Sequence, residues 1–193
     1  MILYYTDWYD SSKRPSHGLL EDAVRAYLTD CGSSEDPEAE AKECLGRIRR
    51  GAHGKPTIPG FPAFSLSHSG SWWGVLIGGS EPVGLDLQVP RPVGTDQMKI
   101  AERFFDPADA EAVRQGGEEV FWRIWVRREA LIKALGTTVI SPVPAVFGVS
   151  PVACGGADWF CREISPDGSV YGAVCTKTPA EIRLRKLIPE QER

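Results

Sequence analysis

The stretch SWWGVLIGGSEPVGLDLQ, residues 71–88, decides the fold class because its pattern recurs at residues 169–186 as SVYGAVCTKTPAEIRLRK. Both segments run from a serine through an aromatic residue, a glycine and an apolar run to a turn with proline and an alternating strand. A repeat offset by about half the chain predicts duplication. We therefore expect an α+β fold of two similar halves, residues 1–98 and 99–193, related by a pseudo-twofold axis with the active site between them.

The segments around the repeat alternate between the two-residue period of strands and the 3.6-residue period of helices. One helix is predicted over residues 17–31, ending at Gly32. Asp36 and Asp106, each followed by proline, are predicted N-caps of further helices that reach about residue 50 and Gly136. A loop is expected at 51–62, and strands are expected at 2–9, 64–67, 71–77, 82–88, 158–165, 169–176 and 181–187.

The composition is that of an ordinary globular protein, with 42% hydrophobic and 25% charged residues. A net charge of −4 argues against a nucleic-acid binder held by its overall field. No apolar run approaches the roughly 20 residues of a membrane span, and the N-terminus lacks the basic and apolar regions of a signal peptide. We expect a cytoplasmic protein without membrane or nucleic-acid partners.

The cysteines give no metal-binding spacing. Their number is odd and they form no CxxC pair, so we expect reduced, structural thiols at Cys31, Cys44, Cys154, Cys161 and Cys175. The three histidines are scattered as well. A bound metal would therefore take oxygen ligands, which favours magnesium over zinc.

The segment FWRIWVRREALIKALG, residues 121–136, places a carboxylate on the most apolar arc of a predicted helix. Trp122, Trp125, Val126 and Ile132 all fall within about 60° of Glu129 when successive residues turn by 100°. The ordinary interpretation is an exposed pair of Glu129 with the lysine one turn later, contributing about 0.2–0.5 kcal/mol. The apolar neighbours favour a second interpretation, a partly buried carboxylate that needs a cation or a metal nearby.

The strand at 82–88 offers a second acidic group. Alternation puts Val83, Leu85 and Leu87 on one face and Asp86 and Gln88 on the other. An aspartate facing solvent from an edge strand is the ordinary interpretation. Taken with the semi-buried glutamate of the helix, Asp86 instead predicts a magnesium site across the cleft.

Magnesium held by few protein ligands is normally completed by water and phosphate oxygens, and phosphate needs donors. Candidate donors are Lys55 in GKP, Ser67 and His68 in SHSG, and Arg128 and Lys133 on the carboxylate's own helix. Each is weak alone, since a loop lysine is usually solvated and SHSG is usually only a turn. Together they indicate a polyphosphate ligand with a divalent ion.

In order and spacing, five segments resemble motifs of the 4′-phosphopantetheinyl transferases of the surfactin-synthetase-associated type: GKP, SLSHSG, PVGLDLQ, AERFF and FWRIWVRREALIKALG. The resemblance implies that fold and a magnesium-dependent enzyme of the holo-[acyl-carrier-protein] synthase type. Such an enzyme moves the phosphopantetheine arm of coenzyme A to a serine of an acyl or peptidyl carrier protein and releases 3′,5′-ADP. It also implies secondary metabolism as the setting, and an internal duplication would make a monomer sufficient.

The resemblance further implies roles for single residues. Asp86 and Glu129 would hold Mg²⁺, or Mn²⁺, on the pyrophosphate of coenzyme A, and Glu129 is a candidate base for the serine. Lys133 would contact the phosphate under attack. The expected coenzyme A contacts are Lys55, Ser67, His68, Arg128 and Lys133, with a weaker placement of further cations at Lys13, Arg14 and His17.

Two positions depart from the family pattern. Gln88 stands where the family usually has a second acidic metal ligand, and Arg128 stands where it usually has lysine. The Gln88 amide can coordinate the ion or leave its place to water, and the site carries one negative charge fewer. Two alternatives stay open: a catalytically impaired module that binds coenzyme A or a carrier protein, and an interaction protein without metal-dependent binding.

Overall fold

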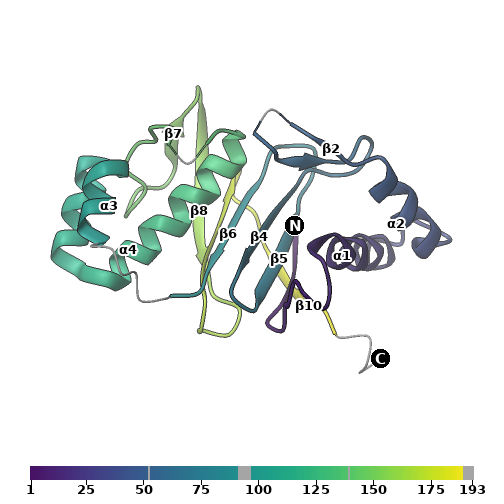
Figure 1. Cartoon of the computed structure of the whole chain (residues 1–193). Helices are drawn as coiled ribbons and strands as arrows, with labels where there is room; N and C mark the ends of the chain where they lie inside the picture. The colour runs from purple at the N-terminus through teal and green to yellow at the C-terminus, as the bar shows by residue number, and fades with distance from the viewer. Residues whose placement is uncertain (52, 91–96, 139, 189–193) are drawn as a thin grey trace.

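The computed structural model describes residues 1–51, 53–90, 97–138 and 140–188 (Figure 1). The expected α+β class is confirmed, as two sheets stand side by side with a pair of helices on the outer side of each. The first sheet is four-stranded, in the order β10 (Arg183–Lys186), β1 (Ile2–Thr6), β5 (Trp72–Ile77), β4 (Phe64–Ser69). The second has the order β6 (Gly84–Gln88), β9 (Tyr171–Thr176), β8 (Ala157–Ile164), β7 (Val152–Cys154).

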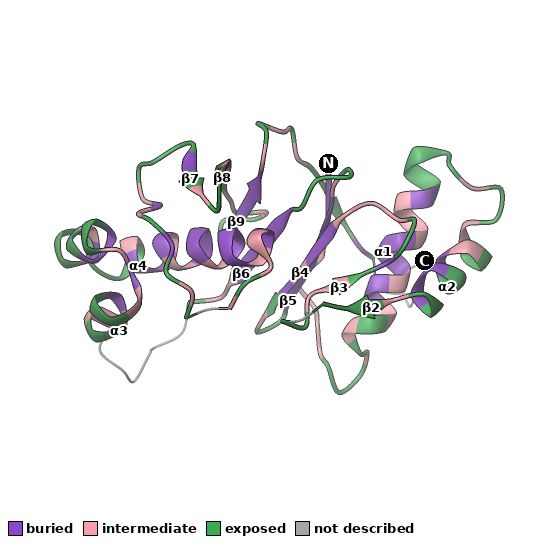
Figure 2. Cartoon of the chain, turned by 90° about the horizontal axis from the view of Figure 1, so that it is seen from above, coloured by how far each residue is buried: buried purple, intermediate pink, exposed green. Residues whose placement is uncertain are grey.

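Helices α1 (Ser16–Cys31) and α2 (Pro37–Gly46) cover the first sheet, and α3 (Gln97–Phe104) and α4 (Pro107–Leu135) cover the second. The buried stripes of α1 and α4 face their sheets (Figure 2). A third apolar cluster fills the space between the sheets and contains Leu3, Trp72, Leu76, Val83, Leu85, Leu87, Val170 and Val174. The order of layers is therefore helices, sheet, sheet, helices. Val83, Leu85 and Leu87 share one face, as the alternation predicts.

The two sheets meet where β4 lies beside β6, and alternate serines bridge the gap. The hydroxyls of Ser65, Ser67 and Ser69 accept hydrogen bonds from the backbone N–H groups of Leu85, Leu87 and Val89, at 3.0, 3.0 and 3.1 Å. Side chains thus replace the backbone ladder along this seam. The seam holds β6, and with it Asp86, at a fixed register against the first sheet.

The two copies of the sequence repeat cross between the sheets in opposite directions. In the first copy β5 belongs to the first sheet and β6 to the second, whereas in the second copy β9 belongs to the second sheet and β10 to the first. Strands from each predicted half therefore complete the sheet of the other half. The boundary at residue 98 stays a prediction.

The predicted elements mostly exist, with shifted ends. Helix α1 ends at Gly32 as expected, with φ of 58°, and Asp36 caps α2 by accepting from the Ala39 N–H. Helix α2 stops short of residue 50 because Arg49–Arg50 (β2) pairs with Pro56–Thr57 (β3) as a small hairpin inside the expected loop. The short strand β7 was not predicted.

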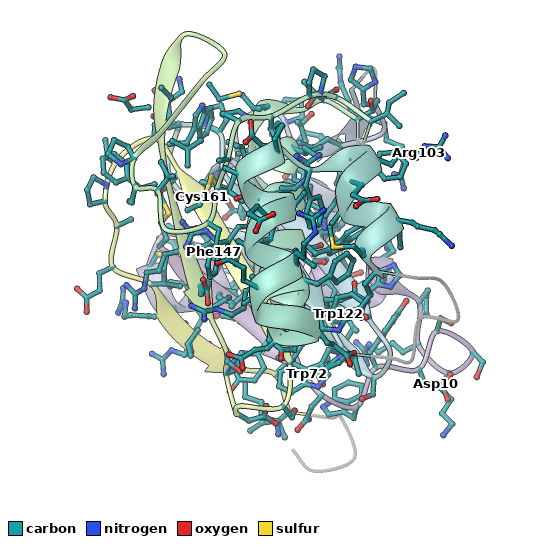
Figure 3. All side chains as sticks on the ribbon, turned by 90° about the vertical axis from the view of Figure 1, so that its left-hand side faces the viewer. Asp10, Trp72, Arg103, Trp122, Phe147 and Cys161 are labelled. Carbon is teal, nitrogen blue, oxygen red and sulfur yellow. A yellow bond between two sulfur atoms is a disulfide. The ribbon has the colours of Figure 1, made fainter. Side chains whose placement is uncertain are left out.

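Helix α4 is interrupted once. Asp106 caps it through the Ala108 N–H, and Gly136 ends it with φ of 69°. Gly117 has φ of 69° and ψ of −149°, so the helix is kinked there and divides into two parts. Figure 3 shows α3 lying beside α4, with Phe147 next to the helix. No helix within the described ranges is both long and apolar enough to span a membrane.

The expectation that all five cysteines are reduced is wrong for one pair. Cys161 and Cys175 form a disulfide, and they are direct cross-strand partners of β8 and β9 with Cα atoms 4.2 Å apart. The sequence shows only that they lie 14 residues apart. Their pairing depends on the register of the two strands, which spacing alone does not fix.

Candidate active site

Close contact between β6 and α4 builds the candidate site. A Cβ atom on Gly84 would lie 1.8 Å from the backbone oxygen of Ala130, so only glycine lets the strand and the helix approach this closely. Residues two apart on a strand point to the same face. Asp86 therefore faces the helix that carries Glu129 and Lys133.

Asp86 is 5% exposed, and its two carboxylate oxygens differ. Oδ1 accepts from Ser67 Oγ at 2.9 Å and from Lys133 Nζ at 2.7 Å. Oδ2 is buried and has no hydrogen-bond partner. Burial raises the pKa of Asp86, while the Lys133 ammonium and the Ser67 hydroxyl oppose that rise. The carboxylate keeps one acceptor for a cation.

Glu129 is half-buried on α4. Burial raises its pKa to about 7, the negative charge of Asp86 adds to the rise, and Lys133 and Arg128 oppose it. The negative charge of Asp86 thus acts on Glu129, although the two residues lie 43 positions apart in the chain. Among the ion pairs of the described residues there is none between Glu129 and Lys133, because the Lys133 ammonium bonds to Asp86 and Ser67 instead. The interpretation of Glu129 and Lys133 as an exposed pair is wrong.

Lys55 lies at the C-terminal end of α4 and bonds to backbone carbonyls there. Its Nζ donates to the carbonyl oxygens of Val83 at 2.8 Å and Lys133 at 2.6 Å. Burial, and then the charge of Lys133, lower the pKa of Lys55 to about 8. Lys55 joins the start of β6 to the last turn of α4, beside a pocket of about 220 Å³ lined by His53, Gly54, Lys55, Pro56, Ser65, Leu66, Lys133, Gly136 and Thr137.

Three further residues that were predicted for the site have contacts with residues other than Asp86 and Glu129. Gln88 is half-buried at the end of β6, and its amide donates to the Val89 carbonyl at 3.4 Å. His68 is exposed, and its ring lies 5.5 Å from that of Tyr9. Arg128 is 3% exposed, with its guanidinium 5.2 Å from the centre of the Phe105 ring and Nη1 without a partner. Arg128 therefore packs toward α3 rather than toward Asp86.

The cations expected ahead of α1 show other partners. Lys13 pairs with Asp10 at 3.5 Å, and Arg14 pairs with Asp22 at 2.6 Å. His17 is exposed. Nothing in these contacts ties the three residues to Asp86.

The donor set fits a magnesium ion. Among the described residues no three His, Cys, Asp or Glu side chains form a metal-binding cluster, and the oxygen ligands expected from the sequence are the carboxylates of Asp86 and Glu129 and the amide of Gln88. Magnesium prefers oxygen ligands and keeps several places for water and phosphate, so two carboxylates suffice. Asp86 Oδ2, buried without a donor, is the acceptor that such an ion would satisfy.

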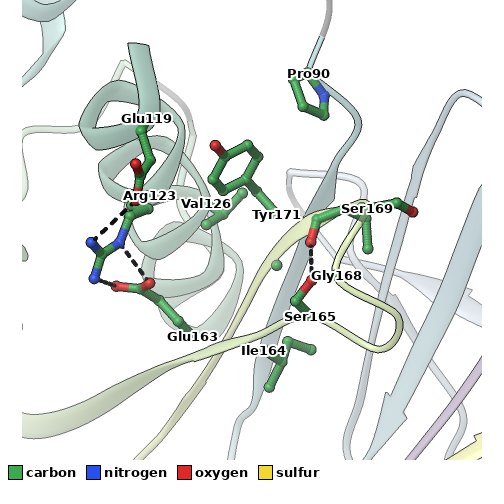
Figure 4. Close-up of a pocket in the computed structure, with 12 residues that line it drawn as sticks. Pro90, Glu119, Arg123, Val126, Glu163, Ile164, Ser165, Gly168, Ser169 and Tyr171 are labelled. Carbon is green, nitrogen blue, oxygen red and sulfur yellow. Dashed lines mark hydrogen bonds and ion pairs between the residues drawn. The ribbon is translucent and has the colours of Figure 1, made fainter. Parts of the chain in front are cut away.

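A larger pocket of about 540 Å³ opens between the C-terminal end of β6 and the middle of α4 (Figure 4). Val126, one turn before Glu129 on α4, faces it, and Tyr171 of β9, the cross-strand partner of Gln88, lines it from the sheet. Arg123 pairs with Glu163 at 2.9 Å along its wall. Sequence reasoning missed this pocket, because its lining comes from segments that are far apart in the chain.

Sequence reasoning also missed the seam. The spacing of SLSHS, with serine at every second position, was a signal that one face of a strand carries only hydroxyls. No pattern in the sequence indicated that these hydroxyls bond to the backbone of another strand.

Comparisons with known proteins lead to a single family. The profile of the 4′-phosphopantetheinyl transferase superfamily matches residues 82–152, which contain Asp86, Glu129 and Lys133. The transferase AcpT of Salmonella typhi is 36% identical over 141 residues, 67% of this chain and 66% of the relative. AcpT of Escherichia coli K12 is 38% identical over 98 residues, 48% of this chain and 50% of the relative.

A third relative, the transferase Sfp of Bacillus subtilis strain 168, is 31% identical over 97 residues, 47% of this chain and 42% of the relative. The matched part of the chain thus spans between 42% and 66% of the length of these three relatives. The site built by β6 and α4 lies inside the matched region. The chain belongs to the 4′-phosphopantetheinyl transferase superfamily.

Proposed function

We propose that this protein transfers the 4′-phosphopantetheine arm of coenzyme A to a serine of an acyl or peptidyl carrier protein and releases 3′,5′-ADP. One observation carries the proposal. The buried Asp86 keeps an oxygen without a donor, next to a second carboxylate, Glu129, and an ammonium group, Lys133. Such a constellation suits a divalent ion on a pyrophosphate.

The arrangement of pockets supports an orientation for coenzyme A. Along α4 the order is Lys133, Glu129, Val126, which runs from the pocket of about 220 Å³ to the pocket of about 540 Å³. Positions 133 and 126 are seven residues apart, which is about 10 Å along the helix at 1.5 Å per residue. We place the nucleotide in the smaller pocket, the pyrophosphate at the two carboxylates, and the pantetheine arm in the larger pocket.

Asp86 and Glu129 would hold magnesium, with Gln88 or water at a further position. When bound, the ion neutralises charge on the pyrophosphate and so favours nucleophilic attack on phosphorus. Manganese has the same preference for oxygen ligands. The orphaned Oδ2 of Asp86 supports this assignment.

The chain's own groups supply the proton transfers. The serine oxygen forms a bond to the β-phosphorus, and the bond from that phosphorus to the oxygen of 3′,5′-ADP breaks. Glu129, directly or through water, takes the serine proton, and Lys133 stabilises the charge on the leaving phosphate. Lys133 can do so by turning its ammonium from Asp86, because its side chain is 30% exposed and can reach solvent.

Several finer expectations belong to this proposal. Both carboxylates come from one chain, which supports a monomer. The reciprocal crossing of the repeat between the two sheets supports a pseudo-twofold duplication. The resemblance is what supports the surfactin-synthetase-associated type, a role in secondary metabolism, and Lys55, His68 and Arg128 as coenzyme A contacts. A cytoplasmic setting belongs to the same proposal.

The test is transfer of a labelled pantetheine arm from coenzyme A to a panel of apo carrier proteins in the presence of Mg²⁺. We expect labelled carrier with the natural chain, loss of labelling when EDTA removes the metal, and a fall of about 100-fold or more with Glu129→Gln. Glu111→Gln is the matched control, because Glu111 lies on the same helix but is 51% exposed. Binding of coenzyme A without labelling of any carrier would favour the impaired binding module.

A further inference from the structure

We propose that Ser67 is a positioning residue that orients Asp86 for the metal, and that it is not a ligand of the coenzyme A phosphates. This inference rests on the proposed function, because it concerns the same site. It assigns to the SHSG segment a role that differs from the phosphate contact expected from the sequence.

The hydrogen-bonding capacity of the Ser67 hydroxyl is fully used inside the protein. Its oxygen accepts from the Leu87 N–H at 3.0 Å and from Lys133 Nζ at 3.0 Å, and its hydrogen goes to Asp86 Oδ1 at 2.9 Å. A serine hydroxyl has one hydrogen and two acceptor lone pairs. A phosphate oxygen needs a donor, and Ser67 could donate only by releasing Asp86.

The position of Ser67 also limits access. The residue is 6% exposed and lies in the seam between β4 and β6, whereas its neighbour His68 is exposed. Strand alternation sends the two side chains to opposite faces. A ligand on the face of His68 therefore does not meet the Ser67 hydroxyl.

The two oxygens of Asp86 differ in their hydrogen bonds, and this difference suits a metal ligand. Ser67 and Lys133 both donate to Oδ1, which fixes the plane of the carboxylate, and Oδ2 is left without a donor. Groups that orient a metal ligand from behind commonly change metal affinity by 10- to 100-fold when they are removed. Loss of the Ser67 hydroxyl should therefore lower the affinity for the metal and leave the affinity for the nucleotide unchanged.

Ser65 provides a matched control one step along the same strand. It is 2% exposed and accepts from the Leu85 N–H at 3.0 Å, the same seam bond that Ser67 makes with Leu87. This seam bond of Ser65 involves neither Asp86 nor Lys133. Comparing Ser67→Ala with Ser65→Ala thus separates the seam bond from the positioning of Asp86.

The experiment measures three quantities for the natural chain and both variants. Binding of 3′,5′-ADP in EDTA is followed by calorimetry, binding of Mn²⁺ by electron paramagnetic resonance, and unfolding by urea. We expect similar urea midpoints for the two variants and unchanged 3′,5′-ADP binding in Ser67→Ala. The half-saturating Mn²⁺ concentration should rise about tenfold or more in Ser67→Ala and stay within about twofold in Ser65→Ala. In transfer assays, Ser67→Ala should lower kcat while KM for coenzyme A at saturating metal stays within about twofold.

Weaker metal-free binding of 3′,5′-ADP by Ser67→Ala would overturn the proposal in favour of a phosphate ligand. Equal metal affinity in the two alanine variants would overturn it in favour of a purely structural serine. Ser67→Thr keeps the hydroxyl, should regain most of the metal affinity, and serves if the alanine variant does not fold. These binding measurements need no turnover, so they decide the role of Ser67 even if the natural chain labels no carrier.

Discussion

Asp22 on the helix that covers the first sheet and Asp86 in the second sheet are both buried, but the protein supplies hydrogen-bond donors to them in different ways. Asp22 on α1 is 7% exposed, and each of its oxygens has an arginine, Arg14 at 2.6 Å and Arg25 at 2.8 Å. Asp86 on β6 is 5% exposed, and both of its donors are on one oxygen. Asp109, 1% exposed, resembles Asp22, because the N–H groups of Val146 and Phe147 satisfy its two oxygens.

The number of carboxylate oxygens that have donors distinguishes an aspartate that stabilises the fold from one that is a candidate ligand. A buried carboxylate that stabilises the fold needs donors on both oxygens, since an unsatisfied buried acceptor costs free energy. Asp22 and Asp109 meet that requirement and Asp86 does not. An incomplete carboxylate is expected where a ligand completes it, and functional sites commonly reduce stability for this reason.

The largest expected effect is on catalysis. Asp86→Asn keeps the shape of the side chain and removes the charge that would hold the metal. We expect transfer to fall by about 100-fold or more. The free energy of unfolding should stay within about 1 kcal/mol of the natural chain, because burying an amide costs less than burying a carboxylate and Lys133 can turn to solvent. A loss of activity that follows only from unfolding would remove the contrast with Asp22.

Gly84→Ala tests the contact that brings the two carboxylates together. Its Cβ would meet the backbone of Ala130 at 1.8 Å, so α4 must move. We expect a loss of about 3 kcal/mol in the free energy of unfolding, measured with urea, and weaker transfer. Gly74→Ala is the control on β5, because its new Cβ would meet the flexible end of Leu87 at 2.9 Å and should cost less. Equal costs at the two positions would show that the approach of β6 to α4 is not limiting.

Asp22→Asn should have the opposite profile to Asp86→Asn. Removing the charge weakens the two ion pairs of this position with Arg14 and Arg25, and we expect the free energy of unfolding to fall by about 2 kcal/mol, since the arginine side chains are 25% and 30% exposed and regain water. Transfer at a temperature where the variant is folded should stay within about twofold. If transfer fell as much as in Asp86→Asn, burial with both oxygens satisfied would not identify a structural aspartate.

The smallest expected effect concerns Lys55. Its pKa is about 8 in the folded chain, below the ordinary value of 10.5 expected when the chain is unfolded. Between these values the unfolded chain binds the proton more tightly, so the contribution of Lys55 to stability rises as the pH rises from about 8 to 10.5. Relative to Lys55→Met, we expect the natural chain to gain about 1 kcal/mol across this window, after allowing for partial exposure. A stability difference independent of pH would mean that Lys55 is solvated.

Much of the local structure follows from the sequence because it depends on neighbouring residues. Asp36 and Gly32 mark helix ends as predicted, since a side-chain acceptor and a residue with positive φ satisfy groups within one turn. The alternation at 82–88 correctly separated Val83, Leu85 and Leu87 from Asp86. The end of α2 was misplaced because Arg49 and Arg50 pair with β3, and such pairing is not visible in the helix's own sequence.

The candidate site divides in the same way. The sequence alone predicted Asp86, Glu129 and Lys133 as candidate site residues, because local periodicity puts each of them among apolar neighbours or at a fixed helical spacing. Only the tertiary structure decided their partners: Ser67 and Lys133 on one oxygen of Asp86, Lys55 on two backbone carbonyls, and Cys161 bonded to Cys175. These contacts join segments that meet through sheet register and the packing of β6 on α4, and their energies depend on burial, which no single segment determines.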